Sequence, residues 1–387
     1  MKVIVGICGS IAAYKSLKLI RLLKKQGADV RVILTTSATQ FVTPLSCQTL
    51  SENEVFIDQF VLTRGIKHIT LSDWADLLVI APASANIIGK AASGIADDLL
   101  STTLVSCAKP ILMVPAMDGN MWQNEIVQSN VARLEEIGYS FLNPVQGLLA
   151  SGKSGTGRFP PPELTLRKIM ALHRGYKSLE GKKFLISGGR TEEDIDPVRI
   201  ITNRSSGRMA LELLYAIVCR NGMAKGVFGE VGIPLPAEMD IVRVRTSSEM
   251  LKQLKRWFGW SDCLVMAAAV GDYKPKKKSQ SKIHTDALTV QLAKNVDLLT
   301  ELSKSRNGQV MVGFSLDEQN HVKKGKQKLA KKGLDIIVLN EPSVLGSDRA
   351  KAQIMRESGK IIKVATTSKW HLAHTILDLC LETMNRS

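Results

Sequence analysis

The chain of 387 residues is long enough for two domains, each with its own hydrophobic core. Its 44% apolar and 23% charged residues are typical of a soluble globular protein, and no apolar run reaches the length of a membrane span. A strand-like segment directly follows Lys2, so no signal peptide is predicted and a cytoplasmic protein is expected. The six cysteines are scattered without a CxxC pair, which favours reduced thiols over disulfides or zinc.

The net charge of +16 raises the question of a nucleic-acid partner. Aromatic residues make up only 5% of the chain, and no recognised nucleic-acid-binding module is present. The densest basic runs, 274–278 and 323–332, lie beside candidate phosphate-binding residues. Anionic small-molecule substrates therefore account for part of the excess charge, the rest is unassigned, and no nucleic-acid partner is predicted.

The first 35 residues predict a βαβ unit. A buried strand over residues 3–7 turns at Gly9-Ser10 into a helix, and a second strand follows over residues 29–35. The turn is not GxGxxG, and the second strand ends in Thr35-Thr36-Ser37 without an acidic residue for a ribose hydroxyl. These features disfavour a dinucleotide. A mononucleotide phosphate at the helix N-terminus suits the hydroxyl side chains better.

A second candidate site follows the strand predicted over residues 77–80. Residues 82–86 form the loop at its carboxyl end, where open α/β sheets place ligands. His68 lies shortly before this strand, and a lone histidine is more often structural than functional. A further strand over residues 111–114 leads into the segment 115–122.

Several motifs of this half occur in the order typical of flavin-containing cysteine decarboxylases. They are Gly9 to Lys15, His68, Ala75 to Asn86, Gly94 to Leu100 and Pro115 to Trp122. The chain resembles that family over almost all of its first 160 residues. The resemblance implies bound FMN, with His68 as the base at the substrate thiol. The FMN-binding residues that it implies are Gly9, Ser10, Ser37, Ser84, Asn86 and Met117.

Two residues depart from the family pattern. Asp118 replaces the asparagine of PAMN, and Ser151 replaces the cysteine of the motif ACGxxGxGRM, the residue thought to protonate the enethiol. Serine has no readily available acidic proton near neutral pH, so either another donor acts or reduction of the enethiol is slow. Asp118 could hold a substrate carboxylate only if it is protonated or bridged. Both residues are expected in the catalytic site.

The boundary between the domains is predicted at Pro160-Pro161-Pro162 and residues 178–182. A new buried strand over residues 184–186 ends at Gly188-Gly189, and a helical pattern begins at Met209. A plain linker would not need Asn203, Arg204 and two serines at one helix start, and free N–H groups and hydroxyls there bind anions. This stretch therefore predicts a second nucleotide-binding unit.

The rest of this unit continues the α/β pattern, with a helix over residues 211–219 and strands over 262–268 and 310–314. Leu288, Val290 and Leu292 alternate as in an exposed edge strand, and residues 294–297 open a helix. A helix starting near His321 carries three lysines on one face, Lys324, Lys328 and Lys332. Spacing alone leaves two interpretations open, a solvated face and an anion site.

The motif DPVRxIxNxSSGxM is similar to the signature of phosphopantothenate–cysteine ligases, and later motifs agree with that family. The resemblance implies CTP as activating nucleotide, Asp272 as ligand of Mg²⁺ or Mn²⁺, Asn203 at the acyl group, and the Ser205 and Ser206 hydroxyls at phosphate. Val296 replaces the family's proline, and Ala350 replaces an asparagine. The implied CTP-binding residues are Met266, Ala267, Ala268, Asp272, Lys282, Lys294, Asn295, Val296, Asp297, Phe314, Lys328 and Lys332.

The whole chain thus resembles the family of bifunctional phosphopantothenoylcysteine decarboxylase/phosphopantothenate–cysteine ligases of coenzyme A synthesis. The expected fold class is α/β, with two Rossmann-like three-layer domains over residues 1–178 and 179–387. The resemblance implies homo-oligomers, with trimeric flavin domains and dimeric ligase domains. Two alternatives from other classes compete with this interpretation. One is a nicotinamide-dependent dehydrogenase, which would need the missing dinucleotide fingerprint, and the other is a basic nucleic-acid-binding protein.

Overall fold

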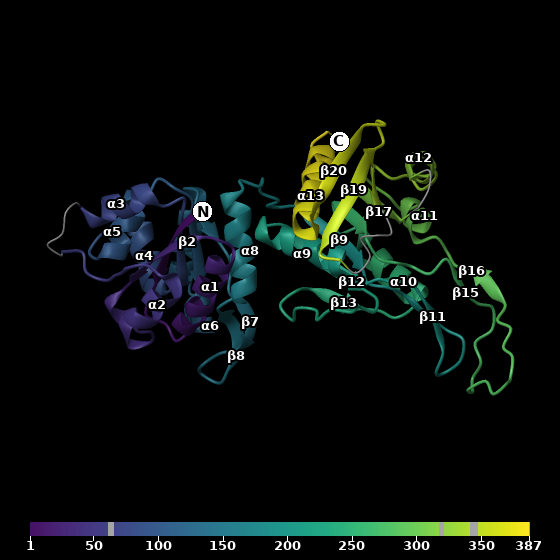
Figure 1. The fold of residues 1–387 in the computed structure, drawn as a ribbon, viewed down its shortest axis with the longest axis horizontal. Helices are drawn as coiled ribbons and strands as arrows, with labels where there is room; N and C mark the ends of the chain where they lie inside the picture. Colours follow the sequence, from purple (N-terminus) through teal and green to yellow (C-terminus); the bar gives the residue numbers. More distant parts are fainter. Residues whose placement is uncertain (61–65, 317–320, 341–346, 387) are drawn as a thin grey trace. The chain divides into compact units, whose positions relative to one another are not determined.

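The structure is a computed structural model that describes residues 1–60, 66–316, 321–340 and 347–386. The chain divides into two compact units, Met1–Tyr176 and Lys177–Ser387, and each is described by itself (Figure 1). The six cysteines are free thiols. In the described part of the chain, no helix is both long and apolar enough to cross a membrane.

The first unit is built on a six-stranded parallel sheet in the order β3-β2-β1-β4-β5-β6. Its strands are β1 (Lys2–Ile7), β2 (Asp29–Leu34), β3 (Val55–Phe56), β4 (Leu77–Ala83), β5 (Ile111–Pro115) and β6 (Ser140–Phe141). Its helices are α1 (Ala13–Lys25), α2 (Pro44–Ser51), α3 (Lys67–Trp74), α4 (Ala85–Ser93), α5 (Leu99–Ser106), α6 (Gly119–Gln123), α7 (Glu125–Glu136) and α8 (Pro162–His173), with a 3₁₀ turn at Thr36–Gln40. A separate hairpin joins β7 (Val145–Leu148) to β8 (Ser154–Arg158).

Helices cover both faces of this sheet. Strands β4 and β5 are buried along their whole length, as expected for strands covered on both faces. Apolar side chains of α3, α4, α5 and α7 pack with the sheet in one core cluster, while α1 and α8 contact each other and the central strands. The unit is therefore a three-layer α/β domain, which confirms the expected fold class.

The second unit has an eight-stranded sheet in the order β13-β12-β9-β14-β17-β18-β19-β20, with only β19 and β20 antiparallel to their neighbours. The strands are β9 (Lys183–Gly188), β12 (Met223–Phe228), β13 (Ile241–Arg243), β14 (Cys263–Met266), β17 (Val310–Leu316), β18 (Ile336–Asn340), β19 (Arg349–Arg356) and β20 (Ile361–Ser368). Two short hairpins stand apart, β10 (Glu192–Asp194) with β11 (Ile200–Thr202), and β15 (Tyr273–Pro275) with β16 (Leu292–Lys294). The helices are α9 (Arg208–Cys219), α10 (Ser247–Phe258), α11 (Leu298–Ser303), α12 (His321–Lys331) and α13 (Lys369–Met384).

Two hydrophobic clusters make this sheet the middle of three layers. Helices α9 and α13 pack on one face, and α10, α11 and α12 pack on the other. The helices are amphipathic for this reason: α9, for example, buries Ala210, Leu211, Leu213, Leu214 and Ile217 against the sheet. The β15–β16 hairpin and its long loop project away from the sheet of this unit (Figure 1).

Three local expectations are corrected. Strand β4 extends through Pro82 to Ala83, because the carbonyl of Pro82 accepts a hydrogen bond from the Cys8 N–H at 3.3 Å and so stays paired. The alternation over residues 288–292 forms no edge strand, since only Leu292 enters β16 and the residues before it belong to no strand. Lys332 lies one residue beyond the end of α12.

Candidate active sites

The first candidate site lies where the strand order of the first sheet reverses, between β1 and β4. Ligands of open α/β sheets bind at the carboxyl ends of the strands at such a point. A cavity of about 450 Å³ opens there, a size common for cofactor sites. Its lining includes Gly9, Thr35, Thr36, Ser37, Ser84 and Asn86.

The approach of Gly9 to Ser37 shapes this cavity. A Cβ added to Gly9 would lie 2.5 Å from the Ser37 Cβ, so only glycine fits without displacing the turn after β2. Ser84 caps α4 by accepting a hydrogen bond from the Ile87 N–H at 3.5 Å. The backbone and hydroxyl groups of three loops therefore converge on one hollow.

Four of the six residues expected to bind FMN line the cavity, and two do not. Ser10 instead donates to the Ala116 carbonyl at 3.4 Å and accepts from the Ala12 N–H at 3.3 Å. Met117 donates its N–H to the Gly157 carbonyl at 3.0 Å, while Met121 lines the cavity. The hydroxyl of Ser10 finds its partner at the end of β5, a contact that the sequence does not reveal.

A charged pair at the cavity was missing from the expected site. Lys90 Nζ lies 2.6 Å from Asp97 and 2.8 Å from Asp98, and both Lys90 and Asp98 line the cavity. Asp98 also caps α5 in a capping box with Ser101. Burial raises the pKa of the neighbouring Cys8 thiol to about 12, so this thiol stays protonated. The sequence segment Gly94 to Leu100 could have indicated this charged pair, because its two adjacent aspartates lie at the start of a helix.

Asp118 and Ser151, the two residues that depart from the family pattern, contact each other. Ser151 Oγ donates a hydrogen bond to Asp118 Oδ2 at 3.3 Å, and Asp118 caps α6 by accepting from the Asn120 N–H at 3.0 Å. A Cβ added to Gly157 would lie 2.2 Å from the Met117 carbonyl, so a glycine in β8 lets this hairpin approach the loop before α6. The β7–β8 hairpin thereby carries Ser151 to Asp118.

His68 belongs to another element, α3. It is half-buried in the first turn of α3, and its carbonyl accepts a hydrogen bond from Ser72 Oγ at 2.6 Å. It is not among the residues that line the 450 Å³ cavity. Its catalytic role therefore stays a prediction.

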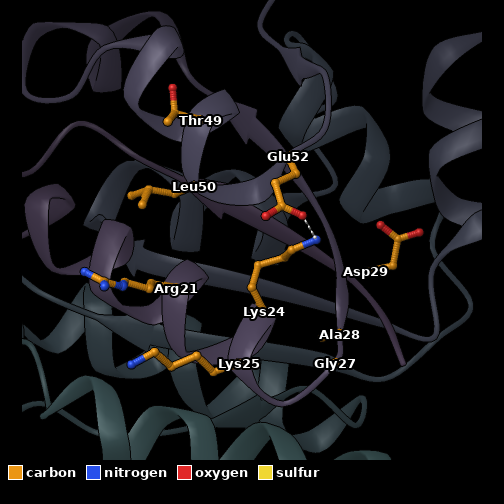
Figure 2. A pocket seen from close by; sticks show the side chains of 9 residues that line it. All are labelled: Arg21, Lys24, Lys25, Gly27, Ala28, Asp29, Thr49, Leu50 and Glu52. Carbon is orange, nitrogen blue, oxygen red and sulfur yellow. Dashed lines mark ion pairs between the residues drawn. The ribbon is translucent and has the colours of Figure 1, made fainter.

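A second hollow of about 650 Å³ lies at the opposite ends of the strands of this sheet, beside the start of β2. Figure 2 shows Lys24 directed toward Glu52, 2.9 Å away, while Arg21 and Lys25 point away from this ion pair. The hollow is open to solvent and lies at the amino ends of the strands. For that reason we place the candidate site in the smaller cavity.

The second candidate site lies where the strand order of the second sheet reverses, between β9 and β14. Backbone bridges join Arg190 after β9 to Glu230 after β12 and to Ala269 after β14. The backbone N–H groups of Ala267 and Ala268 bond to the carbonyl and hydroxyl of Ser187, both at 3.2 Å. Three strand ends are thus held together at one edge.

The expected acyl-site residue lies at this edge. Asn203 Nδ2 donates to the carbonyl of Val270 at 3.1 Å and to that of Ala269 at 3.4 Å. Ser205 Oγ and Ser206 Oγ accept hydrogen bonds from the Gly207 and Arg208 N–H groups at 3.3 and 3.4 Å, at the start of α9. The structure therefore brings Asn203 beside the segment after β14, which is also expected to bind the nucleotide.

Most residues of the expected CTP set lie at or directly after the ends of β14 and β16, within β17, or in and just after α12. The Asn295 N–H donates to the Asp272 carbonyl at 2.8 Å, and Lys294 pairs with Tyr273 in the short hairpin. Lys332 Nζ lies 2.8 Å from Asp297, and Lys328 Nζ lies 2.7 Å from Ser315 Oγ, next to Phe314. Val296 is 51% exposed. Lys282 differs from the other residues of this set in its surroundings. The next residue, Ile283, donates its N–H to Asp196 in the β10–β11 hairpin.

Asp297 and Asp272 have contrasting surroundings. Burial raises the pKa of Asp297, but the hydrogen bond from Lys332, the N–H of Thr300 and the lysine charge together lower it below its ordinary value. Asp272 is exposed, and no cluster of three His, Cys, Asp or Glu side chains suited to a metal occurs within the described ranges.

Comparison with known proteins identifies the family of each unit. Residues 1–173 match the family described as Flavoprotein, and residues 179–384 match the DNA/pantothenate metabolism flavoprotein C-terminal domain. The two units together thus define a flavoprotein of pantothenate metabolism. The chain belongs to the family of coenzyme A biosynthesis bifunctional proteins.

Two relatives illustrate the extent of the match. The coenzyme A biosynthesis bifunctional protein CoaBC of Bacillus subtilis (strain 168) is 36% identical over 97% of this chain and 95% of its own length. The protein of the same name from Borreliella burgdorferi is 33% identical over 97% of this chain and 98% of its own length. This membership decides against a nicotinamide-dependent dehydrogenase.

Similar solved structures correspond to one unit each. A C-terminal domain of a coenzyme A biosynthesis bifunctional protein CoaBC is 27% identical, covers 54% of this chain and 98% of that chain, and has a TM-score of 0.48. A mutant PPC decarboxylase complexed with pantothenoylaminoethenethiol is 31% identical, covers 45% of this chain and 98% of that chain, and has a TM-score of 0.41.

Proposed function

We propose that the two units of this coenzyme A biosynthesis enzyme catalyse consecutive reactions. The second unit ligates cysteine to 4'-phosphopantothenate with CTP, through an acyl-cytidylate. The first unit decarboxylates the product, 4'-phosphopantothenoylcysteine, to 4'-phosphopantetheine. The observation that carries the proposal is the match to bifunctional relatives along nearly the whole chain, at 36% identity over 97% of its residues.

FMN fits the cavity of the first unit better than FAD would. The cavity offers one group of hydroxyls and N–H groups around Gly9, Ser37 and Ser84, enough for a single phosphate. We place FMN there, with Asn86 beside it, and Ser10 and Met117 as supports of the surrounding loops. When bound, FMN would supply reversible two-electron oxidation at the carbon that bears the substrate thiol.

The residues of this unit would handle protons and orient the substrate. His68 would accept the thiol proton, since the unprotonated nitrogen of a neutral imidazole is a general base. Asp118 and Ser151 would act as a hydrogen-bonded pair that faces the substrate and returns a proton after carbon dioxide has left. Loss of carbon dioxide needs no further acid, because the oxidised carbon–sulfur group withdraws the electron pair.

In the ligase unit, lysines would neutralise the triphosphate of CTP. Lys294 ends β16, Lys328 belongs to α12 and Lys332 directly follows it, while Lys282 comes from the loop before β16. Asp272 would hold Mg²⁺ or Mn²⁺ together with phosphate oxygens, which explains a single protein carboxylate at this position. Asn203 would orient the acyl group for attack by the cysteine amine, next to the backbone after β14.

We also propose a cytoplasmic homo-oligomer, with trimeric first units and dimeric second units. Exposed apolar side chains on the first unit, among them Leu45 at 72% and Ile126 at 72%, would be available for contacts between copies. Light scattering of the purified protein would give its mass directly. A monomeric mass at micromolar concentration would contradict this part of the proposal.

The use of CTP is tested by the nucleotide products. Release of pyrophosphate should require 4'-phosphopantothenate, CTP and a divalent cation together, and chelation of the cation should stop it. CMP should appear only when cysteine is also present, because it leaves as the amine captures the acyl group. Cysteine should then convert the activated acid to the amide. Equal turnover with ATP, or turnover in the presence of excess chelator, would contradict the proposed nucleotide site.

A further inference from the structure

The loop that bears Lys282 is bonded to a part of the unit far away in sequence. We define the lysine arm as residues 276–291, between β15 and β16. It contains Lys276, Lys277, Lys278 and Lys282, all exposed. Such a long loop without secondary structure would present its side chains in many positions unless other groups fixed its backbone.

Two groups of the β10–β11 hairpin fix that backbone at Ile283. Asp196 Oδ2 accepts a hydrogen bond from the Ile283 N–H at 3.2 Å, and Arg199 Nη1 donates to the Ile283 carbonyl at 3.1 Å. The same Arg199 nitrogen lies 3.0 Å from Asp196 Oδ2. One ion pair therefore holds both polar groups of the residue that directly follows Lys282.

The Asp196 carboxylate is itself firmly held. Its side chain is fully buried, and Oδ1 accepts the N–H groups of Val198 at 2.8 Å and Arg199 at 2.7 Å. A buried carboxylate in a short hairpin loop is costly unless such donors satisfy it. Because the hairpin turn already supplies two backbone donors, Oδ2 remains directed at the lysine arm.

The same hairpin leads directly to Asn203, the residue expected at the acyl group. Strand β11 ends at Thr202, whose hydroxyl donates to the Thr191 carbonyl at 2.8 Å, and Asn203 follows. The β10–β11 hairpin is thus a rigid connection between Asn203 and the residue next to Lys282. Both positions are expected to act on the same acyl-nucleotide.

We propose that Asp196, together with Arg199, is a positioning residue that holds Lys282 over the nucleotide site. This inference rests on the proposed role of Lys282 toward CTP and adds the residue that makes this role effective. Misplacement of a charged group by about 1 Å can cost about a hundredfold in rate. Removing the clamp should therefore slow ligation almost as much as removing the lysine.

The substitution Asp196→Asn tests the clamp. An asparagine can accept the Val198 and Arg199 N–H groups with Oδ1, but its Nδ2 then faces two other donors, Ile283 N–H and Arg199 Nη1. The variant is compared with Lys282→Gln, with the double variant, and with two controls. Lys277→Gln removes an exposed lysine of the same arm, and Asp194→Asn removes a carboxylate of the same hairpin that pairs with Lys278 and Arg245.

The expected result is non-additive. In the full-length protein, Asp196→Asn and Lys282→Gln should each lower kcat/KM for CTP by about ten- to a hundredfold, and the double variant should be no slower than Lys282→Gln. Lys277→Gln should stay within about threefold because its charge is exposed. Asp194→Asn should do so because its partners Lys278 and Arg245 are exposed, by 60% and 50%. Trypsin should also cleave the lysine arm faster in Asp196→Asn than in the parent protein.

Other outcomes overturn the inference in distinguishable ways. Unchanged ligation by Asp196→Asn, or a double variant whose loss is the product of the two single losses, would show that Asp196 does not act through Lys282. Unchanged turnover by Lys282→Gln would instead remove the proposed role of Lys282 itself. If Asp196→Asn does not fold, Ile283→Pro removes the donated N–H from the exposed arm, and full activity of that variant would overturn the clamp.

Discussion

Ser151 Oγ donates a hydrogen bond to Asp118 Oδ2 at 3.3 Å, across 33 residues of sequence. These are the two positions of the first unit where the chain departs from the pattern of flavin-containing cysteine decarboxylases. We propose that these two residues act together. A cysteine at position 151 would lie beside a carboxylate, whose negative charge raises a thiol pKa.

The contact between Asp118 and Ser151 predicts the effect of introducing the residues that the family has at these two positions. Ser151→Cys alone should not speed the return of the flavin to its oxidised state, because Asp118 would hold the thiol proton. The double variant Asp118→Asn/Ser151→Cys should be faster than either single variant, by about a hundredfold if a general acid is restored. Stopped-flow absorbance of the flavin measures this rate. Ser151→Cys matching the double variant would show that the two positions act independently.

His68→Asn should abolish release of carbon dioxide and leave ligation intact. Asparagine is polar and of similar size, but it cannot accept a thiol proton near neutral pH. His173→Asn, at an exposed histidine of the same unit, is the matched control and should release carbon dioxide at the parental rate. A parallel fall of ligation and decarboxylation in His68→Asn would indicate misfolding and would leave the catalytic assignment without support.

Gly9→Ala should lower the flavin content of the purified protein. The added Cβ would lie 2.5 Å from the Ser37 Cβ and 3.1 Å from the Ser37 backbone carbon, so the loops around the cavity would have to move apart. Gly89→Ala is the control, since the nearest atom to its new Cβ is 3.8 Å away. The flavin released by heat from the parent protein should chromatograph as FMN. Recovery mainly of FAD, or full flavin content in Gly9→Ala, would contradict the assigned cavity.

The stability of the second unit should depend on Asp196 in a pH-dependent way. Burial raises the pKa of Asp196, but three backbone N–H groups and the Arg199 charge lower it below its ordinary value. A lowered pKa stabilises the folded state above the unfolded value of about 3.9, and this stabilisation is lost as pH falls through the folded value. The difference in Tm between the parent and Asp196→Asn should be constant from about pH 5 to 7 and shrink below about pH 4. A difference that persists unchanged at about pH 3 would contradict this origin.

The sequence predicted the parts of the fold that depend on local pattern. Buried strands such as β1 and β9 are continuous apolar runs, and the polar loops that follow them mark both points where the strand order reverses. The alternation from Leu288 to Leu292 failed because a strand needs a backbone partner, which this segment has only from Leu292 onward. The prediction that Pro82 lies in a loop was wrong, because its carbonyl still pairs with the neighbouring strand end.

The contacts that build the sites lie beyond local pattern. Asp196 and Ile283 are 87 residues apart, and nothing in either segment announces their hydrogen bond. The link between Ser10 and Ala116 depends in the same way on the sheet order, which places the ends of β1, β4 and β5 side by side. Sequence motifs indicate which residues have side chains suited to the chemistry. Only the tertiary structure shows which loop holds each of these residues in place.

The proposal that this protein both ligates and decarboxylates is tested most directly by one incubation. The full-length protein is incubated with 4'-phosphopantothenate, cysteine and CTP, and the products are identified by mass spectrometry. We expect 4'-phosphopantothenoylcysteine and 4'-phosphopantetheine as successive products. Without CTP neither should form, whereas added 4'-phosphopantothenoylcysteine should be decarboxylated without any nucleotide. Formation of neither product by flavin-loaded protein would contradict the proposed two-step function.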